Sequence, residues 1–456
     1  MGLFIYTLRS VSGAIVTPPL VFLLILLIMI LHSKNKKVVT MQKIILGGSV
    51  NSSIELTLSQ LVLGIIGGII GSIILTSLGV VFSENSGISY LFVISILLML
   101  IRPRLICFSY SGAILGGIVI IIKLINIFIP YSLGVFDLNI FYLAILIGVF
   151  HVIEGILVIV DGDRGAVPVF TNRDNKILGG YALKRYWALP IAIIIAMNGN
   201  NSMLSYMTES ISNPDWWPLI KLPYGLALIA GSIISIVPFY MVLGYSSITF
   251  TKSKREKAIS SGVHILAYGI ILIASAQISR FGIIGEIFVV IFMPAAHELM
   301  LKLQADREKK QVAKFVSDEE GLVVLEMSAD SRMREFGVDI QSKILSVNGK
   351  KINSEAEVYS ILKENLYNAV LKIKDSHGMV KDIQFRHNKN TRLGILVVPR
   401  NVSKEDIVPV DGGNFKNVLN SLKGSEKGSE NKVEYKIEKE NDGKHDKDVK
   451  NKDNKM

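Results

Sequence analysis

The chain has 456 residues, half of them apolar, and its mean hydropathy of +0.45 lies above the range of ordinary soluble domains. Most of it is therefore expected to lie in a membrane, which excludes a wholly soluble enzyme or binding protein. The formal net charge of +11 does not indicate a nucleic-acid partner, because the cations are concentrated in short loops between apolar segments and in the C-terminal third.

About nine apolar stretches approach the roughly 20 residues that a helix needs to cross about 30 Å of hydrocarbon. They lie near 13–32, 58–82, 88–102, 105–129, 138–160, 187–206, 224–246, 259–278 and 281–301. The stretch at 88–102 is short and the one at 187–206 runs into Asn-Gly-Asn-Asn-Ser, so eight spans are an alternative. The sequence predicts an α-helical polytopic membrane domain over residues 1–302.

Basic residues fall in every second loop, which predicts the orientation. Cations occur at 33–56, 161–186 and 248–258, and two arginines follow the third stretch, whereas the intervening loops carry acids and almost no cations. The positive-inside rule places the basic loops and the C-terminal part in the cytoplasm. With nine spans the N-terminus lies outside. The first stretch is long enough to span and no small-residue cleavage site follows it, so it is predicted to be an anchor.

Two predicted spans have faces of small residues that let helix backbones approach closely. These are Gly64, Gly67, Gly68 and Gly71 in one span and Gly112, Gly116 and Gly117 in another. Close packing is the preferred interpretation, with substrate passage along a glycine face as the alternative. A transporter is less favoured, because matching interrupted helices in two halves are not found in the sequence.

Ionisable residues inside predicted spans are functional hypotheses. His151 and Glu154 lie one helical turn apart, and His264 and His297 fall at a similar depth from the predicted cytoplasmic face. Three imidazoles and a carboxylate can hold a metal ion, but nothing in the sequence shows that they converge. An interhelical hydrogen-bond network is preferred, so no metal, cofactor or catalytic residue is predicted. The single cysteine, Cys107, is interpreted as a packing residue.

The stretch "MPAAHELML" at 293–301 contains half of a zinc-protease motif. Such a helix needs a second histidine four residues after the first, so that both imidazoles face one metal with the glutamate as base. The fourth residue after His297 is Leu301, so the pair His297-Glu298 is not predicted to be a metal site.

The composition changes after residue 302. Residues 303–320 form a polar, helical connector, and a compact module follows at 321–400. Residues 401–456 are low in apolar residues, mixed in charge and without periodicity, so this tail is predicted to be disordered.

The module at 321–400 has the pattern of a small α+β domain. "GLVVLEMS", "KILSVNGKKI", "AVLKIKD" and "VKDIQFR" predict strands, "ADSRMREFGV" a turn and short helix, and "NSEAEVYSILKENL" an amphipathic helix. With "ILSVNGKKI" as its most specific stretch, the module resembles PDZ domains of the bacterial type. It departs from them at Gln341-Ser342, where Gly-Asp is common, and in lacking a carboxylate-binding loop before Gly321.

The stretch "NTRLGILVVPR" at 390–400 can supply this loop through a circular permutation. PDZ domains bind an extended peptide by strand addition. The resemblance therefore implies a groove between 395–399 and 354–366. Its predicted residues are Arg392, Leu393, Gly394 and Ile395 in the loop and Val358 and Leu362 in the side-chain pocket. A structural cap with an empty groove is the alternative.

The loop that follows the fifth span is the most distinctive part of the membrane half. A His-x-x-Glu-Gly helix at 151–155 runs into "DGDRG", which contains Asp161, Asp163 and Arg164. The loop is either a partner surface or a set of charges that fixes orientation and contacts anionic lipid.

Several spans, this loop and a C-terminal PDZ-like module together resemble the MinJ family of cell-division determinants in rod-shaped Gram-positive bacteria. The resemblance implies a non-enzymatic scaffold in the cell membrane, enriched at septum and poles, that links DivIVA-like and MinD-like partners. No catalytic residues come with it. The alternative function is a diverged intramembrane metalloprotease in which the PDZ-like module gates substrates.

Overall fold

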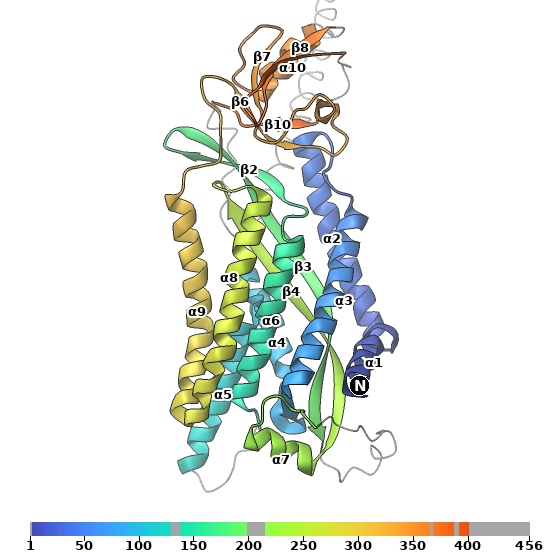
Figure 1. The fold of residues 1–456 in the computed structure, drawn as a ribbon, viewed down its shortest axis with the longest axis vertical. Coiled ribbons are helices and arrows are strands. Elements are labelled where there is room, and N and C mark those ends of the chain that lie inside the picture. Colours follow the sequence, from blue (N-terminus) through green and yellow to red (C-terminus); the bar gives the residue numbers. More distant parts are fainter. Residues whose placement is uncertain (1, 129–136, 198–214, 365–367, 387–391, 401–456) are drawn as a thin grey trace, which may run out of the picture.

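The computed structural model describes residues 2–128, 137–197, 215–364, 368–386 and 392–400. Long helices and two long strands run side by side, and a small sheet domain sits at one end of this bundle (Figure 1). The N-terminus lies nearer the opposite end. The predicted tail at 401–456 falls outside the described residues.

The bundle contains nine of the described α-helices. They are α1 (Gly2–Val16), α2 (Leu20–Leu46), α3 (Ser53–Leu78), α4 (Ser89–Ile101), α5 (Phe108–Phe128), α6 (Ile140–Asp161), α7 (Pro223–Gly231), α8 (Lys254–Ser275) and α9 (Ile283–Lys310). Its strands are β1 (Val81–Ser83), β2 (Val167–Arg173), β3 (Lys176–Met197) and β4 (Ile233–Thr249).

Within the described residues, five helices are long and apolar enough to cross a membrane, which supports a multi-pass membrane protein. They are α3, α5, α6, α8 with the 3-10 turn η3 (Ala276–Phe281), and α9; α1 and α2, bent by 67° at their junction, count as a sixth if taken together. The predicted number of eight to nine spans is therefore wrong. One reason is α4, whose 13 residues reach only about 20 Å.

The described part of the stretch predicted as a span near 187–206 is a strand, and the stretch near 224–246 divides into the short helix α7 and the strand β4. β3 and β4 pair antiparallel from Tyr181 opposite Thr249 to Met197 opposite Ile233. Consecutive β-branched residues such as Ile193 favour an extended backbone, and β3 is buried along most of its length. A fully buried strand is apolar on both faces, so its sequence has the hydropathy of a membrane helix.

Helices cover the edges of this sheet, as strands at membrane depth require. On α3, a Cβ atom added to Gly64 would lie 2.2 Å from the carbonyl oxygen of Ala188, so only glycine permits this approach. About two helical turns further along α3, Ser72 Oγ accepts the N–H of Ala192 at 2.8 Å. The glycine face of α3 therefore packs against the backbone of β3.

The sheet domain follows β5 (Phe315–Val316). It contains β6 (Leu322–Met327), β7 (Lys343–Val347), α10 (Glu355–Glu364), β8 (Ala369–Lys374), β9 (Val380–Phe385) and β10 (Ile395–Val397). The strands form an antiparallel sheet of order β10-β6-β7-β8-β9. These strands and the helix lie where the sequence predicts them. The predicted tight turn at Asn348-Gly349 has positive φ angles of 48° and 75°, and the short helix is one 3-10 turn at Arg332–Arg334.

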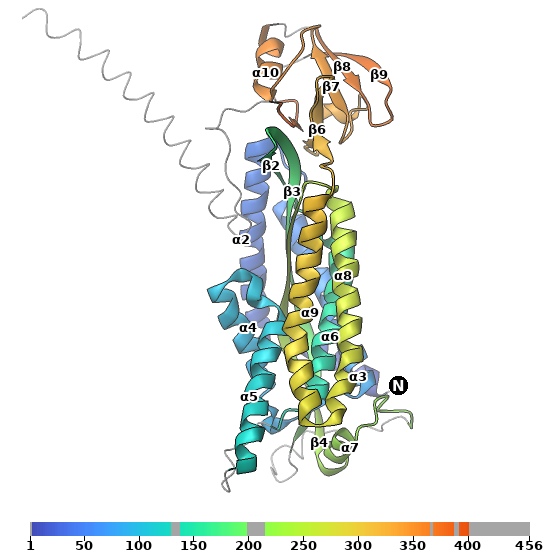
Figure 2. The same ribbon diagram turned by 90° about the vertical axis from the view of Figure 1, so that its left-hand side faces the viewer.

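The sheet domain and the bundle share apolar contacts. β5 pairs with β3, which places Phe315 opposite Gly179. Alternate residues of β6 point in opposite directions: Val324 packs in the core of the sheet domain, whereas Val323 and Leu325 belong to the core of the bundle. The connection is visible where β2 and β3 reach β6 (Figure 2). The sheet domain is therefore docked on the bundle through one face of its sheet.

The basic loops gather at the end that carries the sheet domain (Figure 1). Residues 161–186 form mainly the β2–β3 hairpin, whose turn at Asp174 and Asn175 has positive φ angles of 53° and 59°. Two neighbouring helices begin there with serine caps, Ser52 for α3 and Ser253 for α8. Placement of the loops at 33–56, 161–186 and 248–258 at one end agrees with their predicted common side of the membrane, whereas Arg104, counted with the basic set in the sequence, pairs with Glu298 near the middle of α9.

Candidate functional site

The predicted peptide-binding strand, β10, forms one edge of the sheet and pairs with β6 alone. Gly394 precedes it with a φ of +69°, and a Cβ atom there would lie 2.3 Å from Ser328 Oγ. The N–H of Ser328 donates to the Gly394 carbonyl at 2.8 Å. Because Val398 also donates toward β6, the N–H and C=O groups of Val397 point away from β6, to the edge with which no described strand pairs, and Val397 itself is only 2% exposed there.

The side chains predicted to line the groove lie instead in the core of the sheet domain. Val358, Leu362, Leu393 and Ile395 are all buried there. The amphipathic face of α10 is thus used for packing against the sheet. These side chains are therefore not available to a ligand, and only main-chain groups of β10 are left for contact with one. Tyr359 of α10 accepts the N–H of Leu393, just before β10, at 3.1 Å.

Arg392, predicted to attract a peptide carboxylate, contacts the bundle. Its Nη1 donates to the carbonyl oxygen of Ile44 at 3.0 Å, near the C-terminal end of α2. A cation at this position is favourable because the last carbonyl groups of a helix carry partial negative charge. Burial raises the pKa of Glu355 to about 7, and the charge of Arg392 opposes this shift.

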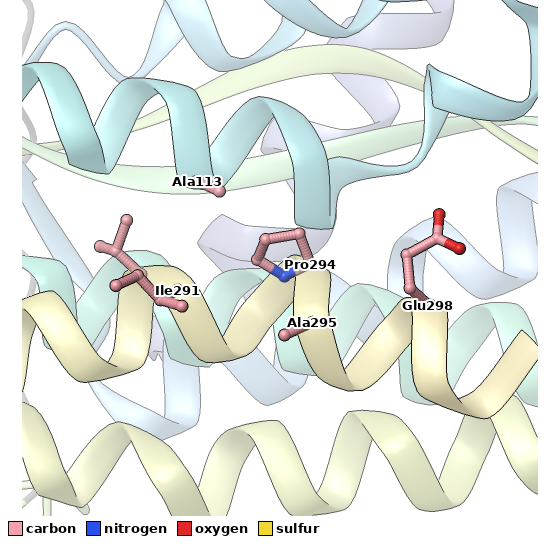
Figure 3. A pocket seen from close by; sticks show the side chains of 6 residues that line it. Ala113, Ile291, Pro294, Ala295 and Glu298 are labelled. Atoms are coloured by element: carbon pink, nitrogen blue, oxygen red, sulfur yellow. The ribbon is translucent and has the colours of Figure 1, made fainter.

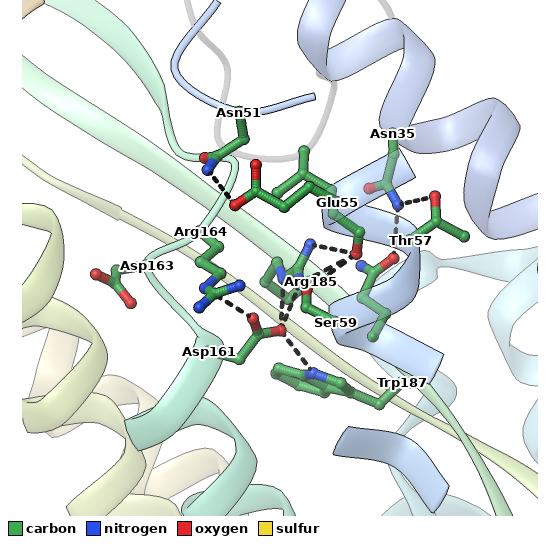
Figure 4. Close-up of polar contacts among 12 residues, drawn as sticks. Asn35, Asn51, Glu55, Thr57, Ser59, Asp161, Asp163, Arg164, Arg185 and Trp187 are labelled. Carbon is green, nitrogen blue, oxygen red and sulfur yellow. Dashed lines mark hydrogen bonds and ion pairs between the residues drawn. The ribbon is translucent and has the colours of Figure 1, made fainter. Parts of the chain in front are cut away.

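Asp161 belongs to the "DGDRG" stretch after the fifth predicted span, which is called the signature loop below. Asp161 is fully buried and its hydrogen bonds join three elements (Figure 4). Its Oδ2 accepts from Arg185 Nε and from Trp187 Nε1, both at 2.9 Å. Arg185 also donates to Ser59 Oγ on α3 at 2.7 Å. A buried network of this kind joins α6, β3 and α3, so Asp161 is not part of an exposed partner surface.

The other two loop residues are more accessible. Asp163 forms an ion pair with Arg255 at 3.4 Å, and Arg164 lies 3.6 Å from Asp161 with about half of its side chain exposed. Of the loop residues named in the sequence, these two are the ones available to lipid or to a partner.

A second polar cluster lies inside the bundle, and no spacing motif in the sequence predicts it. Cys107 at the start of α5, His151 in α6 and His297 in α9 present ligand atoms that all lie within 4.8 Å of one another. Cys107 Sγ is 3.1 Å from His151 Nε2 and 3.5 Å from His297 Nε2. Glu154 Oε2 is 4.0 Å from His151 Nε2.

Glu298 lies beside this cluster, but its own polar partners lie outside it. It accepts a hydrogen bond from Tyr110 and forms an ion pair with Arg104. It also lines a hollow of about 480 Å³ between α5 and α9, together with Ala113, Val290, Ile291, Pro294 and Ala295 (Figure 3). Thus Glu298 is held in place by a cation and a phenol.

His264, considered with the other histidines in the sequence, is not in the cluster. Its ring bonds the Ser260 carbonyl at 2.6 Å and Arg307 at 2.9 Å. Cys107, interpreted from the sequence as a packing residue, takes its place. The available signal was that Cys107 follows two arginines and precedes Ser109 and Tyr110, an unusual density of polar side chains between two apolar helices.

Comparisons of the chain with models of protein families, with curated proteins and with solved structures found no match.

Proposed function

We propose that the protein is a membrane scaffold that recruits cytoplasmic partners through its C-terminal sheet domain, by adding an extended peptide to the free edge of β10. The observation that carries the proposal is the edge position of β10, beside α10 and directly after the left-handed Gly394. Main-chain groups at a sheet edge bind an extended segment with little regard to its side chains. Because the predicted pocket residues are buried in the domain core, main-chain groups are the proposed source of the affinity.

The docking of the sheet domain on the bundle supports a scaffold. A domain fixed against the membrane half presents its edge strand at a defined height and direction. The resemblance of the sequence to the MinJ family proposes the partners, a DivIVA-like protein and a MinD-like protein. The PDZ-like character of the domain belongs to the same proposal.

The alternative, a diverged intramembrane metalloprotease, is less favoured. A zinc protease needs a glutamate free to act as a base on a metal-bound water. Glu298, the glutamate next to His297, is instead engaged by Arg104 and Tyr110.

Two substitutions at one position test the proposal. Val397→Pro removes the N–H that points away from β6 and leaves the bonds to β6 in place, whereas Val397→Ala keeps this N–H and removes two methyl groups from the same buried side chain, so it controls for lost packing. The full chain in nanodiscs is titrated with purified DivIVA-like and MinD-like proteins. We expect binding by the wild type and the Ala variant and at least about a tenfold loss for the Pro variant. Equal binding by both variants, or none by the wild type, would contradict the proposal.

The full chain is needed for this measurement. Residues Val323 and Leu325 of β6 and Leu396 and Val398 at β10 pack against the bundle, so an isolated fragment of residues 303–400 would expose them.

A further inference from the structure

The side chains of Cys107, His151 and His297 meet inside the bundle, and their hydrogen-bond partners determine where the protons lie. His151 Nδ1 is 2.8 Å from the carbonyl oxygen of Ile147. A carbonyl only accepts, so Nδ1 carries the proton and donates it. In the neutral ring, Nε2 then has a free lone pair, and this atom faces Cys107 Sγ at 3.1 Å.

Ser109 lies near His151 Nε2, at 3.3 Å, but its proton is used elsewhere. Tyr268 donates its hydroxyl proton to the carbonyl of Met293 at 2.7 Å. The contact between Ser109 Oγ and the Tyr268 hydroxyl, at 2.8 Å, therefore needs the serine proton. The lone pair of His151 Nε2 is left facing the thiol.

The neighbours of His297 also determine where its proton lies. Tyr110 donates its proton to Glu298, which also pairs with Arg104. The contact of 3.2 Å between Tyr110 and His297 Nδ1 must then use the proton on Nδ1. His297 Nε2 is consequently a second free lone pair, 3.5 Å from the same sulfur atom.

One thiol proton cannot satisfy two imidazole lone pairs that point at one sulfur atom. Both rings are instead oriented as metal-ligating histidines are, with Nε2 toward the site and Nδ1 held by an acceptor outside it. We propose that Cys107, His151 and His297 bind a zinc ion. Zinc replaces the thiol proton, which leaves to solvent, so the sulfur binds as a thiolate and both lone pairs are used.

The two sulfur–nitrogen separations are close to those around this ion, and the three ligand atoms all lie within 4.8 Å of one another. With Zn–S near 2.3 Å and Zn–N near 2.0–2.1 Å in a tetrahedron, sulfur and nitrogen ligands lie about 3.5 Å apart. The two observed Sγ–Nε2 separations are 3.1 and 3.5 Å. A small outward movement of one ring therefore makes room for the ion.

Glu154 is the fourth ligand in this proposal. It lies one turn after His151 on α6, with Oε2 4.0 Å from His151 Nε2 and, within the described part of the chain, no closer polar partner. A zinc ion with one thiolate and one carboxylate has no net charge, as burial between membrane helices favours.

The test measures zinc in the full chain, purified in mild detergent, by elemental analysis. We expect about one zinc per chain in the wild type and less than about a tenth in Cys107→Ser and in the double variant His151→Gln with His297→Gln. The matched control is His264→Gln, which removes a histidine that contacts Ser260 and Arg307 and not the cluster. This variant is expected to retain the zinc. Glu154→Gln is expected to bind more weakly than the wild type in a titration with buffered zinc.

Cobalt supplies a second readout that does not depend on metal acquired during growth. Cys107 is the single cysteine of the chain, so a thiolate-to-cobalt absorption band in the metal-free protein reloaded with Co²⁺ identifies this sulfur as the ligand. The band is expected in the wild type and absent in Cys107→Ser, with unchanged circular dichroism. Absence of the band in the wild type, or zinc retained by the Cys107→Ser and double-histidine variants, would overturn the proposal in favour of a hydrogen-bonded thiol–imidazole cluster.

Discussion

Lys254 at the start of α8 forms an ion pair with Glu326 of β6, with 2.5 Å between Nζ and Oε2, and thereby links the bundle to the sheet domain. The Glu326 side chain is fully buried, whereas Lys254 is about one-quarter exposed. The second carboxylate oxygen of Glu326 accepts the N–H of Met327 at 3.1 Å. The pair is thus a polar contact inside an otherwise apolar junction.

Removing the cation from this pair is expected to loosen the junction. Lys254→Ala leaves the Glu326 carboxylate buried without its counter-charge, which costs about 2 kcal/mol or more. We expect faster hydrogen exchange in β5 and β6 and easier cleavage of the connector by protease, with the spans unaffected. Lys310→Ala, at the exposed end of α9, is the control and should behave as the wild type. Equal protection in the two variants would show that the apolar contacts alone hold the junction.

The two aspartates of the signature loop are expected to differ sharply. Asp161→Asn leaves the buried guanidinium of Arg185 without a carboxylate, for which a loss of about 3–5 kcal/mol of unfolding free energy is typical. Asp163→Asn breaks only a partly exposed pair with Arg255 and should cost less than about 1 kcal/mol. Thermal unfolding of both variants in bicelles measures the difference, and similar losses would contradict the structural role assigned to Asp161.

The sheet domain is expected to lose stability as the pH rises from about 4.5 to 7. Burial raises the pKa of Glu355 from the usual 4.5 to about 7, so the folded domain holds this proton more tightly than the unfolded chain does. The resulting stabilisation is complete below pH 4.5 and is lost as the pH passes through 7.

Glu355→Gln should therefore stabilise the domain at pH 8 by about 1–2 kcal/mol, allowing for partial exposure, and have little effect at pH 4. Amide hydrogen exchange of β6–β8 at both values measures this. Glu364→Gln, at an exposed pair with Lys350, is the control and should show no such dependence. A pH-independent effect of Glu355→Gln would refute the assigned cause.

The turn of the β2–β3 hairpin is expected to face the cytoplasm. Asp174→Cys in a Cys107→Ser background should resist an impermeant thiol reagent added to intact cells. The basic loops lie at this end of the molecule, and the positive-inside rule places them in the cytoplasm. A cysteine at Lys221, exposed before α7 at the opposite end, should react. The reverse labelling pattern would invert the orientation of the whole chain.

The sequence predicts the sheet domain better than the bundle. Alternation in "AVLKIKD" and the helical period around Val358 are local signals, and both elements form where they are predicted. The run from Ile191 to Ile195 has no such signal, because it is buried on both faces. Length and hydropathy then favour a helix. The strand forms because β4 pairs with it and the glycine face of α3 packs against its backbone.

The polar cluster could not be predicted from spacing. Cys107 is 44 residues from His151 and 190 residues from His297, so helix packing alone brings them together. The sequence does suggest His151 and Glu154 as functional candidates by their position in apolar segments, and it places His297 at a similar depth. The sequence groups His264 with them because residue number indicates how deep a side chain lies in the membrane. Residue number does not show toward which neighbouring helix that side chain points.

β3 connects the two ends of the molecule as a single element. It pairs with β1 through Ile194 near one end and with β5 through Gly179 near the other, over 22 residues and roughly 70 Å. A slip of one residue along its neighbours would exchange the two buried faces of β3 and move Arg185 away from Asp161. β3 is therefore one continuous hydrogen-bonded element that joins the strand β1 at one end of the bundle to the sheet-domain junction at the other.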